Sequence, residues 1–248
     1  MKKKKILILG SSGTLGRCLF NSLKKKNKYI ILHNGLIRRK FDLSYQFQIA
    51  KLLNKTKPDL IINCSAIINI DYCERYKKKS KKINVETLNH IFLLKKKLNL
   101  DFELIQISTD QMYNRSNCLA SSEKSKTYIL NEYTKQKIEC ENLCNKNKAL
   151  ILRLNYFAYE KNNLFYWIVN SIKKNKKVYF FKHVYFNPLS LTSLSNIISQ
   201  IAKKKIQGKF DGVYNLGSKG FISKSEFAIY INKKFKKYRF NNYNVVLS

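Results

Sequence analysis

The sequence predicts an α/β protein built on one parallel sheet that helices cover on both faces. Two observations support this prediction. Short apolar runs recur through the first 155 residues, and stretches with apolar residues at helical spacing lie between them. Strands buried on both faces form continuous apolar runs, which is typical of a parallel sheet between two helical layers. We therefore expect a doubly wound parallel sheet.

The expected elements alternate along the chain. Helical patterns lie near residues 15–26, 45–55, 83–98 and 132–147, and later near 162–175, 191–204 and 223–236. No linker rich in Pro, Gly or Ser divides the chain. We expect a first domain over residues 1–155 and a smaller lobe over residues 156–248, packed on the first and partly interleaved with it. The strand candidates are Ile6–Leu9, Tyr29–Leu32, Leu60–Asn63, Glu103–Ile107 and Leu150–Leu154.

A glycine-rich turn follows the first predicted strand, where Gly10, Gly13 and Gly16 stand at three-residue spacing before a helical pattern. Such a turn forms a phosphate cradle, because glycine lets the backbone approach a pyrophosphate and free N–H groups at the helix start bind the anion. The commoner spacing is G-x-G-x-x-G, and glycine-rich turns also occur as plain loops. Its place after a strand near the N-terminus favours a dinucleotide site on a Rossmann-type fold.

Polar residues mark the ends of two further strands. Ser65 and Ala66 follow the third strand and Thr109 follows the fourth, and ligands of such sheets bind at the carboxyl ends of the strands. Tyr133 and Lys137 lie four residues apart early in a predicted helix and project from one face. A tyrosine has a reference pKa of about 10, and a neighbouring ammonium lowers it toward the range useful for proton transfer.

The Tyr-x-x-x-Lys spacing alone carries little information, because both residue types are abundant and Tyr230 and Lys234 share it by chance. The place of Tyr133 about 25 residues after Thr109 favours the catalytic interpretation.

The formal net charge of +34 has two interpretations. A nucleic-acid or anionic-membrane partner is one. The other is the composition of an AT-rich genome, which fills solvated positions with Lys, and we favour it because the lysine runs are spread over the whole chain. We expect no nucleic-acid partner.

Six cysteines form no C-x-x-C pair, the three histidines are scattered, and no apolar stretch reaches about 18 residues. We therefore expect a cytoplasmic protein without a metal, a signal peptide or a membrane span.

In their order and spacing, the motifs resemble the extended short-chain dehydrogenase/reductase family, and within it the dTDP-4-dehydrorhamnose reductases. The resemblance covers nearly the whole chain. It departs at Gln111, where the reductases usually have Tyr and the dehydratases of the wider family a second acid, and the chain is expected to be short at its C-terminus. The motifs are G10-S-S-G-T-L-G16, K57-P-D-L-I-I-N-C-S-A66, I105-Q-I-S-T-D110, N131-E-Y-T-K-Q-K137, Asp71, Glu74, Asn84-Val85, L152-R-L-N-Y-F157, Asn187-Pro188 and Val213-Tyr214-Asn215-Leu216.

The resemblance implies a reductase that acts on a nucleotide-linked 4-keto-6-deoxy sugar in the synthesis of cell-surface polysaccharide precursors. Tyr133 would donate the proton, Lys137 would bind the nicotinamide ribose and lower the tyrosine pKa, and Thr109 would hydrogen-bond the substrate carbonyl. The cofactor site would comprise Gly10, Gly13 and Gly16 at the pyrophosphate, Ser11, Ser12, Thr14 and Leu15 along the turn, Ser65 and Ala66 on the adenosine and ribose side, and Asp42 close to the adenine.

NADPH is favoured over NADH by the residues themselves. NAD sites commonly place an acid about 20 residues after the glycines, on the ribose 2′-OH. The sequence has no acid there, and Arg38 and Arg39 follow, either of which could pair with a 2′-phosphate. Three alternatives stay open: an NAD-dependent sugar-nucleotide epimerase, a non-catalytic NADP-binding regulatory subunit like that of methionine adenosyltransferase, and a nucleic-acid binding protein. A homodimer is also left open.

Overall fold

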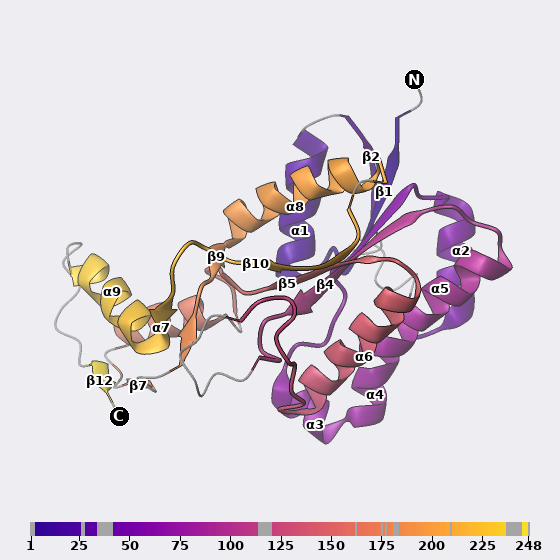
Figure 1. The fold of residues 1–248 in the computed structure, drawn as a ribbon. Helices are drawn as coiled ribbons and strands as arrows, with labels where there is room; N and C mark the ends of the chain where they lie inside the picture. The colour runs from indigo at the N-terminus through magenta and orange to yellow at the C-terminus, as the bar shows by residue number, and fades with distance from the viewer. Residues whose placement is uncertain are drawn as a thin grey trace.

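A computed structural model describes residues 3–25, 28–33, 42–113, 121–161, 163–174, 176, 178–180, 184–208, 210–236 and 245–247. Among these residues, six parallel strands form the central sheet, in the order β10-β5-β4-β3-β1-β2 (Figure 1). The strands of this sheet are β1 Lys5–Leu9, β2 Ile30–His33, β3 Leu60–Asn63, β4 Glu103–Thr109, β5 Leu150–Leu154 and β10 Gly212–Leu216.

Helices cover both faces of the sheet, as the sequence predicts, because successive side chains of each strand point to opposite faces. On one face, Leu7, Ile61 and Ile151 pack with α2, α5 and α6. On the other, Ile8, Ile62 and Leu152 pack with α1 and α8. Figure 1 shows the two helical layers on either side of the strands. These helices are α1 Thr14–Lys25, α2 Gln46–Thr56, α5 Thr87–Lys97, α6 Glu132–Lys146 and α8 Leu191–Lys205.

A second, smaller core lies in the C-terminal part of the chain. It joins α7, which spans Leu164–Lys173, to α9, which spans Lys224–Lys236, through Ile168, Ile172 and Phe227. Both helices lie to one side of the central sheet in Figure 1. The short strands of this part are β6 Tyr156–Phe157, β7 Val178–Phe180, β8 Tyr185–Phe186, β9 Leu189–Ser190, β11 Ile222–Ser223 and β12 Val245–Leu247.

The expected strands and helices of the first half are confirmed to within one residue at their ends, with three larger differences. β4 runs two residues further, to Thr109, because its end still pairs with β5. The helix expected near 83–98 opens with a π-helical turn, η2, which spans Lys82–Glu86. The third difference is two short helices that the sequence analysis did not foresee, α3 at Ile70–Arg75 and α4 at Lys77–Lys81.

The C-terminal part is interleaved with the sheet of the first half. β10, which is not among the strand candidates of the sequence analysis, pairs with β5 as the sixth strand, and α8 packs on α1. The division of the chain at residues 155 and 156 therefore does not separate two sheets, and the boundary stays a prediction.

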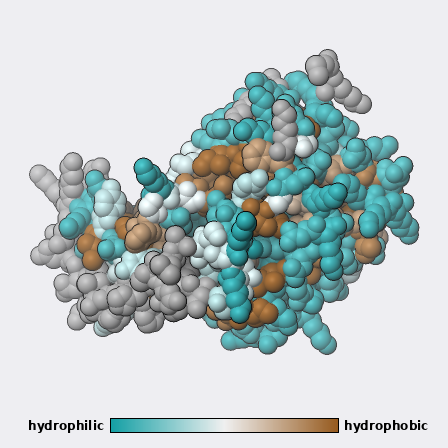
Figure 2. Space-filling model, viewed as in Figure 1, coloured by the Kyte–Doolittle hydropathy of each residue, from teal (hydrophilic) through white to brown (hydrophobic). Residues whose placement is uncertain are grey.

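Hydrophilic side chains cover most of the visible face over α2, α5 and α6 (Figure 2). Several lysine runs end helices, as in α1, α5 and α8, where positive charge is favourable beside the carbonyl ends of the helix. Of the helices that the structure describes, none is long and apolar enough to cross a membrane.

Candidate active site

The strand order reverses between β1 and β3, and Gly10 and Ser65 meet at the carboxyl ends of these two strands. Ligands of open α/β sheets bind at such a switch point. Gly10 has a φ of +72°, and a Cβ there would lie 2.7 Å from the Ser65 backbone nitrogen. Only glycine therefore fits at this position without parting the two strands.

The turn after Gly10 leads directly into α1. The Gly13 N–H donates to the Gly10 carbonyl oxygen at 3.0 Å, and a Cβ on Gly16 would collide with that same oxygen. The described first turn of α1 holds no acidic side chain that would repel an anion from its N–H groups. The three glycines thus allow a tight, close-packed turn that leads directly into the helix N-terminus.

The other predicted residues of the turn differ in exposure. Ser12 is exposed, Thr14 is half-buried and Ser11 is buried. Leu15, expected along the turn, places its side chain in the core beneath the sheet, so only its backbone can face a ligand.

Ser65 and Ala66 lie in the segment that follows β3, directly after Cys64. The backbone N–H and hydroxyl of Ser65 both donate to Asn63 Oδ1, and Asn63 Nδ2 donates to Gln106 Oε1 at 2.8 Å. Ile67 follows Ala66, and the side chain of Asn84 in η2 binds its backbone. Asn84 Oδ1 accepts from the Ile67 N–H at 2.7 Å, and Asn84 Nδ2 donates to the Ile67 carbonyl oxygen at 3.0 Å. This segment is therefore held in place beside the glycine turn from two sides.

The remaining residues that were predicted to bind the cofactor are Asp42, Arg38 and Arg39. Asp42 is exposed and accepts a hydrogen bond from the Ser44 N–H at 2.9 Å, in the turn before α2. Arg38 and Arg39 lie outside the described residues, so the 2′-phosphate interpretation stays a prediction.

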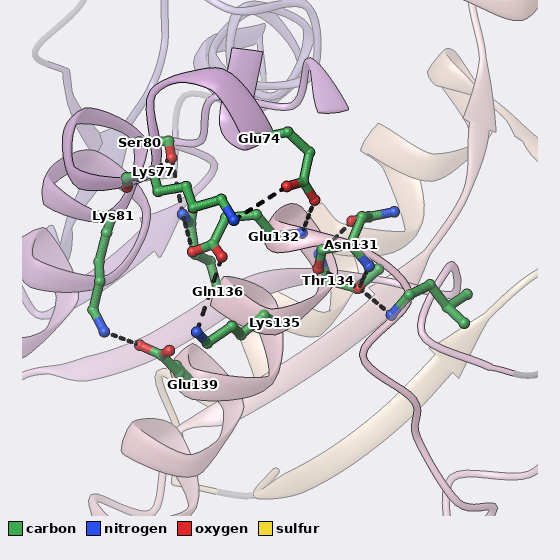
Figure 3. Close-up of polar contacts among 11 residues, drawn as sticks. Glu74, Lys77, Ser80, Lys81, Asn131, Glu132, Thr134, Lys135, Gln136 and Glu139 are labelled. Carbon is green, nitrogen blue, oxygen red and sulfur yellow. Dashed lines mark hydrogen bonds and ion pairs between the residues drawn. The ribbon is translucent and has the colours of Figure 1, made fainter. Parts of the chain in front are cut away.

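The helix α6 begins at a strongly anchored N-terminus (Figure 3). Asn131 Oδ1 accepts from the Thr134 N–H and Thr134 Oγ1 accepts from the Asn131 N–H, which is a reciprocal capping box. The Glu74 carboxylate of α3 accepts from the Glu132 N–H at 2.6 Å. These contacts fix the first helical turn, which carries Tyr133.

Tyr133 and Thr109 come together at the carboxyl end of β4. The Tyr133 side chain is only 6% exposed. Burial raises the pKa of Tyr133 above its ordinary value, and a hydrogen bond with the Thr109 side chain lowers it in part. Thr109 Oγ1 also accepts from the Gln111 N–H at 3.2 Å.

Lys137 lies one helical turn beyond Tyr133. Its Nζ donates to the Ile107 carbonyl oxygen at 3.0 Å and lies 5.8 Å from the centre of the Tyr133 ring. Burial lowers the pKa of Lys137. The pKa of Tyr133 is thus raised overall, where the sequence analysis expected it to be lowered, because burial of the phenol is the largest influence on it.

The sequence analysis missed a buried ion pair beside these residues. Glu141 accepts from Arg153 Nε at 3.0 Å and Nη2 at 2.5 Å, and from Ser108 Oγ at 2.6 Å. Two signals could have found it. Glu141 follows Lys137 by four residues on the same helix face, and Arg153 is a lone charge in the apolar strand β5.

Within the described part of the chain, no three His, Cys, Asp or Glu side chains gather as metal ligands would. Cys64, directly after β3, is half-buried, and loss of solvent around its thiol raises its pKa to about 12. Its thiol is therefore un-ionised near neutral pH.

The fold is a doubly wound sheet with a glycine-rich turn at its switch point, and a threonine, a tyrosine and a lysine lie at the adjoining strand end. This combination defines an extended short-chain dehydrogenase/reductase, a class of NAD(P)-dependent oxidoreductases. The chain belongs to the family of the RmlD substrate binding domain, whose model matches residues 4–246.

Three similar proteins carry the same name. The dTDP-4-dehydrorhamnose reductase of Aggregatibacter actinomycetemcomitans is 25% identical over 232 residues, which are 92% of this chain and 78% of that protein. The solved dTDP-4-dehydrorhamnose reductase of Clostridium acetobutylicum is 26% identical, with a TM-score of 0.83 over 98% of this chain and 83% of its own. That of Bacillus anthracis, solved in complex with NADP, is 22% identical, with a TM-score of 0.84 over 100% and 85%.

Proposed function

We propose that this protein is an NADPH-dependent reductase of a nucleotide-linked 4-keto-6-deoxy sugar, of the dTDP-4-dehydrorhamnose reductase type. The observation that carries the proposal is the meeting of Thr109 and Tyr133 at the carboxyl end of β4, with Lys137 one turn behind. The family membership and the names of the relatives support the substrate class.

The proposed chemistry divides the work between the cofactor and the chain. When bound, the nicotinamide supplies a hydride to the carbonyl carbon of the sugar. Thr109 donates its hydroxyl hydrogen to the carbonyl oxygen, and Tyr133 protonates that oxygen as charge develops on it. The raised pKa of Tyr133 suits this role, because it keeps the phenol protonated near neutral pH. The ammonium of Lys137 then stabilises the phenolate that remains.

The glycine cradle fits a dinucleotide, since a Cβ at Gly10 or Gly16 would occupy the space that close backbone packing requires. In the proposal, Gly10, Gly13 and Gly16 hold the pyrophosphate with the backbone of residues 11–15. Ser65 and Ala66 contact the adenosine and ribose side, and Asp42 lies close to the adenine. Lys137 binds the nicotinamide ribose.

NADPH is the proposed cofactor on two grounds: the arginines at positions 38 and 39, and the NADP bound in the Bacillus anthracis relative. The proposed place of the reaction is the synthesis of cell-surface polysaccharide precursors, where such 4-keto sugars are reduced.

The test supplies NADPH and a dTDP-4-keto-6-deoxy sugar to the full chain and follows the loss of NADPH absorbance. Tyr133→Phe is expected to lose about 10²- to 10⁴-fold in kcat, the usual contribution of a positioned acid. Tyr230→Phe is the matched control. Tyr230 is exposed and has the same four-residue spacing to a lysine, Lys234, whose Nζ lies 5.4 Å from the ring centre. The control is expected to retain wild-type activity.

Two results would overturn the proposal. One is an absence of NADPH oxidation by the wild-type protein, and the other is an undiminished rate in Tyr133→Phe. Tightly bound NAD that co-purifies without net consumption would point to the epimerase instead. Cofactor binding without turnover would point to the regulatory subunit.

A further inference from the structure

Three polar side chains of α6 form a stripe along its face toward β4. Tyr133, Lys137 and Glu141 follow one another at four-residue spacing, so they lie above one another on one face of the helix. Each reaches a neighbouring residue of β4. Tyr133 meets Thr109, Lys137 Nζ donates to the carbonyl oxygen of residue 107, and Glu141 accepts from the hydroxyl of residue 108.

Glu141 is almost fully buried, at 4% exposed, and so is its partner Arg153, at 7%. Removing two charges from water costs several kcal/mol each, and apolar residues of similar volume are often as stabilising as such a pair. The core on this face of the sheet is otherwise apolar along β5, with Ile151 beside Arg153. Stability alone therefore does not explain why a buried carboxylate lies one helical turn beyond Lys137 on the same face of α6.

Arg153 also connects Glu141 to the rest of the sheet. Its Nη1 donates to the Tyr113 hydroxyl at 2.6 Å, and that hydroxyl donates to Asn215 Oδ1 at 2.8 Å. Ser108, Arg153 and Asn215 are register partners on β4, β5 and β10. Glu141 is thus fixed to three adjacent strands.

We propose that Glu141, held by Arg153 and Ser108, is a positioning residue for the reductase: it fixes the stripe of α6 against β4 and supplies the negative charge that keeps Lys137 an ammonium. The inference rests on the proposed function, because it assigns Glu141 a role behind the proposed proton donor and its lysine.

The electrostatic part depends on which groups face Lys137. Burial lowers the pKa of Lys137, and the carboxylate of Glu141 raises it. The other titratable groups near Lys137 are un-ionised at neutral pH, because burial raises the pKa of Cys64 to about 12 and that of Cys140 to about 11, and raises those of Cys144 and Tyr133 as well. Of these described neighbours, Glu141 is the one that carries negative charge, and its ion partner Arg153 is held protonated by the same contact.

The test compares Glu141→Gln with Glu139→Gln in the full chain. Glu139 lies on the same helix but pairs with Lys81 at 2.8 Å on the outer side (Figure 3). Initial rates and NADPH affinity are measured across pH. Glu141→Gln is expected to lower kcat roughly 10- to 100-fold, as misplacement of a catalytic group does, while KM for the sugar stays within about twofold. The control is expected to match the wild type.

The pH profile separates a positioning role from a merely structural one. Without the Glu141 charge, Lys137 loses its proton at lower pH, so the alkaline fall in kcat moves to lower pH in Glu141→Gln. The same substitution is expected to move the alkaline weakening of NADPH binding in the same direction, because Lys137 is proposed to bind the ribose. Two results overturn the inference. One is a loss of kcat in Glu141→Gln without a shift in the alkaline fall of either kcat or NADPH binding. The other is an equal loss of kcat in Glu139→Gln.

A double variant, Glu141→Leu with Arg153→Met, keeps the test decisive if Glu141→Gln leaves Arg153 unpaired and unfolds the protein. Apolar replacement of both partners leaves neither charge of this pair buried without its partner, so the fold is expected to survive. This variant is expected to show the loss of kcat and a shift of the alkaline limbs in the same direction, which is smaller than in Glu141→Gln because the Arg153 charge is removed as well. If the wild type binds NADPH but reduces no sugar, the proposed function fails, and the pH dependence of NADPH binding in the variants still decides the role of Glu141.

Discussion

The close approach of Gly10 to β3 leads to a measurable prediction for Gly10→Ala. The alanine would have to adopt a φ of +72° and place its Cβ 2.7 Å from Ser65 N and 2.8 Å from the Cys64 carbonyl carbon and oxygen. Ordinary contacts begin at 3.4 Å, so the backbone at the ends of β1 and β3 must move apart. The substitution therefore disturbs both the fold and the cradle.

The expected destabilisation by Gly10→Ala has two parts. The left-handed backbone costs an alanine about 1–2 kcal/mol, and overpacking against the backbone of β3 adds about 1–3 kcal/mol. The expected loss in the free energy of unfolding is their sum, about 2–5 kcal/mol. For a chain of this size each kcal/mol lowers Tm by about 2–4 °C.

Gly208→Ala is the matched control. Gly208 has a φ of +71°, but a Cβ there would meet nothing within 4 Å, so only the backbone cost of about 1–2 kcal/mol applies. Thermal unfolding gives the stability of each variant, and fluorescence titration gives its NADPH affinity. Gly10→Ala is expected to bind NADPH at least about tenfold more weakly, a loss of about 1.4 kcal/mol, and Gly208→Ala to bind it normally. Equal destabilisation of the two variants would refute the close approach, and normal NADPH affinity in a folded Gly10→Ala would refute the cradle.

Two further predictions concern stability. Burial raises the pKa of Asp59, but hydrogen bonds from Lys4 and the Lys5 N–H more than offset this and hold it below its ordinary value. Above the ordinary carboxyl pKa, the wild type should therefore be more stable than Asp59→Asn. Urea titrations should show that this difference in stability vanishes as the pH falls through the folded-state pKa of Asp59. A difference that persists in acid would contradict the assignment. Gln106→Leu removes the partner of buried Asn63 Nδ2 and is expected to cost about 1–3 kcal/mol in urea unfolding, and a cost near zero would contradict it.

Most strands of the first half were predictable because they are short apolar runs buried on both faces, whereas β2, at the edge of the sheet, is only partly buried. Leu60–Asn63 and Leu150–Leu154 end where the sequence places them. The π-helical turn before α5 was not predictable, because it depends on Asn84 holding the backbone of Ile67 and the side chain of Gln136. These are tertiary contacts between distant segments, and local propensity does not encode them.

The candidate site was predicted in part. Sequence spacing placed Tyr133 and Lys137 on one helix face and Thr109 at a strand end, and the structure brings them together. The direction of the Tyr133 pKa was wrong, because burial of the phenol exceeds the effect of any neighbouring charge and depends on the packing around α6. Glu141 and Arg153 were overlooked, because an ion pair between a helix and a strand is visible only once the two elements are packed.

The sequence by itself determined the alternation of strands and helices, the glycine turn and the shared helix face, since these depend on residue type and spacing along a local stretch of chain. Only the tertiary structure decided that β10 completes the sheet, that Leu15 belongs to the core and that a carboxylate stands behind Lys137. Burial and pairing across the fold set those features, and both depend on which distant segments exclude water together.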